Sequence, residues 1–152
     1  MTELDVTPTL GPDAFDGPHR LMLADLVARL AASVPTLARE YEAAAGQAEG
    51  ALGQTLEDLA RAKHAQAADL APLASALGVP APSAPRVAPP TSPLSWGVIL
   101  GEAFQGERAI ERAGRELGAL AVDPLVKALA ARLAAGAARD GQAVRKLYLR
   151  YT

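Results

Sequence analysis

Six prolines are concentrated in residues 79–93 and divide the chain into two halves. They stand at positions 80, 82, 85, 89, 90 and 93, a density that neither a helix nor a central strand tolerates. In polyproline-like form, at about 3.1 Å per residue, this segment reaches roughly 45 Å, whereas a helix of some 26 residues is about 39 Å long. We therefore predict a crossover that can run the full length of a helical bundle.

On both sides of this crossover, apolar residues recur at steps of three and four, which is typical of amphipathic helices. The 35 alanines and the low aromatic content of 4% favour closely packed helices over a sheet. Pro18 and Pro124 are suited to first helical positions and Gly78 to a helix end, whereas Pro35 and Pro72 are expected to kink or interrupt their helices. The predicted helices cover about 18–45, 52–77, 94–121 and 124–150. The fold class is therefore all-α, a four-helix bundle of two hairpins joined by one long crossover.

Charge and composition exclude several classes of protein. With 15 Lys and Arg against 17 Asp and Glu, the chain has no global field that would gather nucleic acid. The absence of cysteine excludes disulfides, thiolate metal sites and a catalytic thiol. Residues 1–17 lack Lys and Arg and lack an apolar run, so we expect a flexible acidic arm rather than a secretory signal. No uninterrupted apolar stretch is long enough to span a bilayer, and we expect a cytoplasmic protein with no membrane partner.

Three charged residues fall on the apolar stripes, where a bundle places its chemistry. At 100° per residue, Lys63 lies near the centre of the second stripe, and Glu107 and Asp140 lie between apolar neighbours of the third and fourth. Tyr41 and Gln66 lie near the edges of their stripes. These five side chains are the candidate site.

The distance of each residue from its hairpin turn predicts which of them lie at one depth. The midpoint of positions 107 and 140 is at the turn between the third and fourth helices. Reflecting Lys63 about the Gly46 region gives Leu30. We therefore expect Leu30, Lys63, Glu107 and Asp140 to form one level of the bundle.

Over residues 18–151 this arrangement resembles the ferritin-like family, of the rubrerythrin and bacterioferritin type. The resemblance implies that each hairpin supplies a Glu from its first helix and a Glu-x-x-His from its second, which together hold two iron ions. Here the Glu positions are Leu30 and Glu107, and the paired motifs are Lys63–Gln66 and Asp140–Ala143. Only two of six ligands are carboxylates, so the di-iron site is degenerate.

Because two buried carboxylates need a shared proton or a cation, we predict that the Lys63 ammonium lies between Glu107 and Asp140 in place of metal. In a first alternative, Lys63 extends to solvent and the carboxylates lie at a hydrated rim. In a second, Glu107 and Asp140 hold one metal ion with water. A shifted register of the second helix would add His64 as a ligand, with Arg61 in place of the motif's Glu. No cofactor is expected, and iron is the alternative.

Three functional hypotheses follow. The first is a ferritin-like bundle without a functional di-iron centre that acts as a binding or interaction module, as a homodimer or with an unknown protein partner. The second is an iron-dependent oxidase or peroxide-scavenging protein with an atypical carboxylate site. The third is a bundle that binds lipid or a hydrophobic small molecule, although we expect no basic face for membrane association. The homodimer expectation depends on small residues expected on outer faces, namely Ala43, Ala44, Ala131, Ala134, Ala135 and Ala138.

Overall fold

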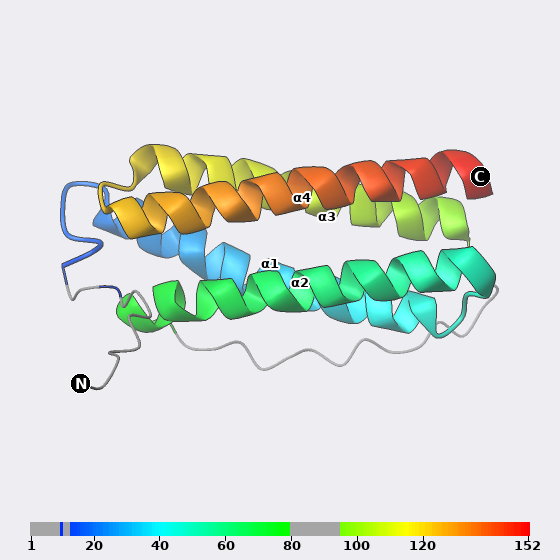
Figure 1. Cartoon of the computed structure of the whole chain (residues 1–152). Helices are drawn as coiled ribbons and strands as arrows, with labels where there is room; N and C mark the ends of the chain where they lie inside the picture. The colour runs from blue at the N-terminus through cyan, green and yellow to red at the C-terminus, as the bar shows by residue number, and fades with distance from the viewer. Residues whose placement is uncertain (1–9, 11–12, 80–94) are drawn as a thin grey trace, which may run out of the picture.

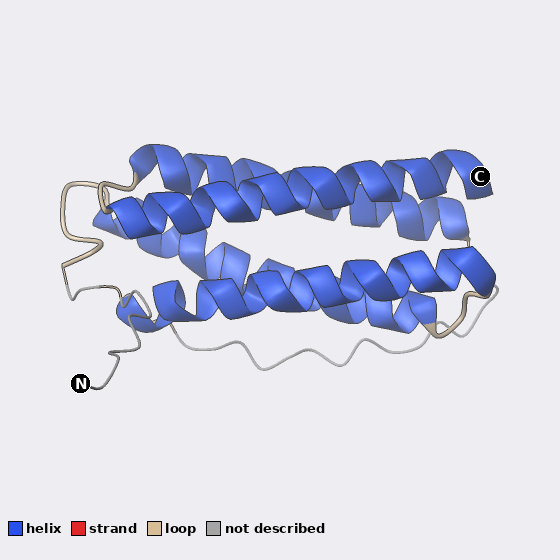
Figure 2. Cartoon of the chain, in the orientation of Figure 1, coloured by secondary structure: helices blue, strands red, loops and turns tan. Residues whose placement is uncertain are grey.

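The computed structural model describes residues 10, 13–79 and 95–152, and within them it contains four helices and no strand (Figure 1, Figure 2). The predicted all-α class is therefore confirmed for the described residues. The predicted crossover, except for Val79, lies outside them. The helices are α1 (Arg20–Ala45), α2 (Gly50–Ala76), α3 (Trp96–Leu120) and α4 (Pro124–Tyr151).

The helices pack as two hairpins, α1 with α2 and α3 with α4. Between the hairpins, α1 packs against α3 and α2 against α4, whereas within the described residues the backbones of the diagonal pairs do not come close to each other. The end of α2 and the start of α3 lie at opposite ends of the bundle (Figure 1). Neighbouring helices are consequently antiparallel, and residues from all four helices meet in one core.

Neither internal proline interrupts its helix, so of the two expected effects, a kink or an interruption, the interruption is wrong. Pro35 lies inside α1, which runs for 26 residues, and Pro72 lies inside α2, which runs for 27. An interior proline destabilises a helix by about 3 kcal/mol. Buried residues on both sides of each proline, Val34 and Leu37 in α1 for example, hold these helices in place through tertiary packing.

The start of α4 illustrates how local sequence positions the site. Asp123 Oδ1 accepts hydrogen bonds from the backbone N–H groups of Leu125 at 2.9 Å and Val126 at 3.1 Å. Pro124 occupies the first turn, where its missing N–H is not needed. This cap ends the α3–α4 connection within a few residues and aligns the two helices closely.

The N-terminal arm is shorter than predicted. Ala14 is only 8% exposed and Phe15 only 2% exposed, and both belong to the core. An aromatic ring gains considerably from burial, which explains why the chain folds back on the bundle at this point. The expectation of a flexible arm up to residue 17 therefore fails for these two residues.

By length and composition, α1 alone among the described helices could cross a membrane. A core helix of a bundle meets the same test, and α1 is amphipathic. Ten of its residues are buried, among them Leu23, Leu26 and Leu30, whereas Asp25 and Arg29 are exposed and paired with each other. Its apolar face is already covered by α2 and α3.

Candidate functional site

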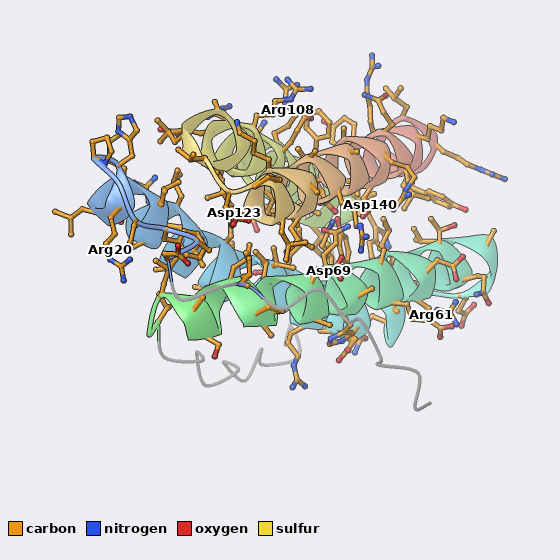
Figure 3. All side chains as sticks on the ribbon, turned by 60° about the vertical axis from the view of Figure 1, so that its left-hand side comes forward. Arg20, Arg61, Asp69, Arg108, Asp123 and Asp140 are labelled. Atoms are coloured by element: carbon orange, nitrogen blue, oxygen red, sulfur yellow. The ribbon has the colours of Figure 1, made fainter. Side chains whose placement is uncertain are left out.

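The three predicted charged residues meet in the centre of the bundle. The Lys63 Nζ of α2 lies 2.7 Å from Glu107 Oε1 of α3 and 2.8 Å from Asp140 Oδ2 of α4. Lys63 and Glu107 are fully buried, and Asp140 is 5% exposed. Asp140 projects from α4 on the side that faces α2 (Figure 3).

Tyr41 and Gln66 complete the same group of side chains. The Tyr41 hydroxyl of α1 donates to Glu107 Oε2 at 2.8 Å. Lys63 Nζ donates to Gln66 Oε1 at 2.6 Å, and Gln66 Nε2 donates to Asp140 Oδ2 at 3.0 Å. We call Tyr41, Lys63, Gln66, Glu107 and Asp140 the buried cluster. Every helix contributes at least one member.

Two glycines of α4 lie against the buried cluster, and one of them, Gly136, makes room for Gln66. A Cβ atom at Gly141 would lie 3.5 Å from the Glu107 Cβ, which shows how closely α3 and α4 approach. A Cβ atom at Gly136 would lie only 2.8 Å from Gln66 Nε2. Sequence reasoning missed both glycines. The available signal was their place inside an alanine-rich helix next to Asp140, since glycine is about 1 kcal/mol less favourable there than alanine.

Leu30 does not lie at the same depth in the bundle as the buried cluster. The expectation that it would assumed that Leu30 and Lys63 are equally far from the turn near Gly46. His64 of α2 pairs with Glu42 of α1, so the true midpoint of this hairpin lies further along the chain than Gly46, and α2 begins beyond the end of α1 (Figure 1). The α1 residue beside Gly106, and therefore next to Glu107, is Leu37, at 3.5 Å from a Cβ atom there. Seven residues of helix place Leu30 about 10 Å away.

The Glu107 carboxyl group has a pKa raised to about 6, chiefly because burial disfavours its charged form. The Lys63 ammonium and the Tyr41 hydroxyl lower this pKa, whereas the negative charge of Asp140 raises it. The contact of Glu107 Oε1 with Lys63 Nζ is a close ion pair without an aligned hydrogen bond. Glu107 therefore changes between its charged and its neutral form near pH 6 and is mostly charged at pH 7.

The Tyr41 hydroxyl is held in its neutral form. Burial, and then the neighbouring Glu107 carboxylate, raise its pKa above the ordinary value for tyrosine. As a phenol it keeps the proton that it donates to Glu107 Oε2. Tyr41 therefore orients and stabilises the carboxylate.

His64 does not join the buried cluster. It is exposed and pairs with Glu42 of α1 on the surface, so the register that would place it in the core as a ligand is wrong. Within the described residues, no group of three or more His, Cys, Asp or Glu side chains could hold a metal ion. The position between Glu107 and Asp140 is taken by the Lys63 ammonium, so these residues do not fit a di-iron centre.

The fold and the site together define an all-α protein with a buried cation between two carboxylates. Comparisons of this chain with protein-family models, with curated proteins and with solved structures found no match.

Proposed function

We propose that this protein is a ferritin-like bundle that works without a di-iron centre, as a binding or interaction module. The observation that carries the proposal is the position of the Lys63 ammonium, within 2.8 Å of carboxylate oxygens from both α3 and α4. In a metal-dependent bundle, inward-facing carboxylates hold cations. Here the chain supplies its own cation.

The donors and acceptors of the buried cluster support this proposal. An ammonium group has three protons, and Lys63 Nζ has three close oxygen neighbours, on Gln66, Glu107 and Asp140. The Tyr41 hydroxyl donates a hydrogen bond to the second carboxylate oxygen of Glu107. A metal ion binding here would displace a buried ammonium and leave it without partners, which is strongly unfavourable.

Metal loading tests the proposal. The purified protein is incubated anaerobically with ferrous iron, desalted, and assayed for iron per chain. We expect retention near zero, and retention of about one iron or more per chain would instead support the oxidase hypothesis, because an iron centre needs stoichiometric metal.

A variant makes this test sharper. In Lys63→Ala the two carboxylates lose their cation, so Mn²⁺ is expected to raise the melting temperature of this variant and not that of the wild type. Arg61→Ala, which removes an exposed cation from the same helix, is the matched control. If Mn²⁺ stabilises the wild type as much as Lys63→Ala, the ammonium does not exclude metal and the proposal fails.

Fewer of the alanines expected on the outer faces, where they would form a homodimer, are exposed than predicted. Ala44 and Ala134 are buried at 6% and 7% exposure, because they pack inside the bundle. Ala131 and Ala135 are exposed. The homodimer remains a proposal, and the surface of the module has to be sought elsewhere on the bundle.

A further inference from the structure

The charges of α4 are almost entirely of one sign. This helix has six cations, and its single carboxylate, Asp140, is buried, whereas α1 and α2 together expose five carboxylates and four arginines. Among the described residues, Arg145, Lys146 and Arg150 have no carboxylate partner. The C-terminal part of α4 is therefore a local cationic surface on a chain whose net charge is −2.

Large apolar side chains are exposed at the same end of the bundle. Of the seven such side chains among the described residues, four lie there: Val98, Tyr148, Leu149 and Tyr151. Leu149 is 69% exposed and Val98 57%. At 100° per residue, Leu149 projects between Arg145 and Lys146. An apolar centre flanked by cations is consequently directed away from the core.

A hollow of about 380 Å³ lies between α3 and α4 beside these residues. Its lining includes Phe104, Tyr148 and Leu149, with Arg145 as its charged member. Gly101 also lines this hollow, and a Cβ atom there would lie 4.0 Å from the Tyr148 ring, an ordinary van der Waals distance. An apolar hollow with a guanidinium group suits an anionic amphiphile better than a wholly polar ligand.

We propose that the surface formed by Val98, Arg145, Lys146, Tyr148, Leu149, Arg150 and Tyr151, the basic apolar end, docks on an anionic phospholipid bilayer. Charge complementarity favours this occupant, because cations near a bilayer surface are attracted to anionic headgroups. Tyrosine rings suit the interface between headgroups and acyl chains, and leucine and valine suit the outer acyl region. The more acidic side formed by α1 and α2 would be repelled, which orients the molecule.

This inference rests on the proposed function, because it names the surface that the module uses. It also replaces the expectation of no basic face and no membrane partner. The expectation of no membrane partner followed from the lack of an apolar stretch long enough to span a bilayer, whereas docking at the headgroups requires only an exposed surface of this kind.

Vesicle co-sedimentation tests the inference with the full chain. The protein is mixed with vesicles of phosphatidylcholine alone and, separately, with vesicles of equal parts phosphatidylcholine and phosphatidylglycerol. We expect binding to the anionic vesicles only, and its loss at about 0.5 M salt, where surface charges are screened. Each cation raises partitioning about fivefold, so the triple variant Arg145→Ala, Lys146→Ala, Arg150→Ala is expected to bind roughly a hundredfold more weakly.

Matched variants separate the basic apolar end from charge in general. Arg29→Ala, Arg39→Ala, Arg61→Ala removes three exposed cations from α1 and α2 and is expected to weaken binding by less than threefold. Leu149→Ser keeps every charge and is expected to weaken binding about tenfold, because its side chain no longer inserts. Circular dichroism verifies that each variant is folded.

Three outcomes would overturn the inference: no binding to anionic vesicles, whether or not the protein binds poly-glutamate, equal binding to neutral vesicles, or equal losses for both triple variants. A dimer in sedimentation velocity that dissociates in Leu149→Ser would also overturn it, since a second copy would then cover this surface. Iron retention would refute the proposed function without changing vesicle binding, so the two failures are distinguishable.

Discussion

Replacing Lys63 with methionine removes the cation of the buried cluster while keeping most of the side-chain volume. Glu107 and Asp140 then remain in the core without the ammonium that lies 2.7 and 2.8 Å from them. Removal of one partner from a buried ion pair destabilises a protein by about 3–5 kcal/mol. Since a domain of this size has an unfolding free energy of about 5–15 kcal/mol, Lys63→Met is expected to remove a large fraction of it at neutral pH.

The loss is expected to depend on pH with a definite sign. Lys63 lowers the pKa of Glu107, which burial has raised to about 6. Without Lys63 this pKa rises further above its unfolded value, so the folded variant takes up a proton more readily than the unfolded one. Protonation therefore stabilises the folded variant, and the difference from the wild type shrinks as pH falls from about 8 towards 5.

Urea unfolding followed by circular dichroism at several pH values measures this difference. The comparator is the variant Lys63→Met, Glu107→Gln, Asp140→Asn, which removes all three charges and is expected to recover much of the lost stability at pH 7. A difference below about 1 kcal/mol for Lys63→Met, independent of pH, would show that the carboxylates are hydrated in solution and would refute the reasoning.

Three further predictions concern the same core. Glu107 contributes about 2 kcal/mol of stability that is present below pH 4.5 and lost as pH rises through about 6, so the wild-type urea midpoint falls over this window and that of Glu107→Gln does not. Tyr41→Phe leaves Glu107 Oε2 without its donor; we expect a loss of about 1–3 kcal/mol in urea unfolding and a higher Glu107 pKa by NMR titration. Gly136→Ala forces Gln66 to move and is expected to lower the melting temperature, whereas Gly106→Ala, with ordinary contacts at its Cβ, is expected to raise it.

The second hairpin was predictable from sequence because its turn is short and capped. Asp123 and Pro124 determine where α4 starts, so equal distances from the turn place Glu107 opposite Asp140. The structure agrees, since a Cβ atom at Gly141 would lie 3.5 Å from the Glu107 Cβ. In such a hairpin, helical periodicity and equal distance from the turn are sufficient to predict which residues face each other.

The first hairpin was predicted less well for the opposite reason. Its connection has no proline and no side-chain cap, Gly50 has a φ of 60°, and α2 starts beyond the end of α1 (Figure 1). Because of this offset, the α1 residues at the depth of Lys63 are close to Leu37 and Tyr41 rather than Leu30. Periodicity around each helix was sufficient to place Lys63 in the core, because rotation about the axis does not depend on the offset along it.

The buried cluster also limits how the two hairpins align. Alanine and leucine surfaces pack acceptably at several offsets, since apolar contacts have no direction. Lys63 and Gln66 come from the first hairpin, Glu107 and Asp140 from the second, and their oxygen and nitrogen atoms meet at 2.7–3.0 Å. Sliding one hairpin by a single residue would move these groups apart by about 1.5 Å and leave buried charges without partners. The cluster therefore disfavours alternative alignments even where its net contribution to stability is small.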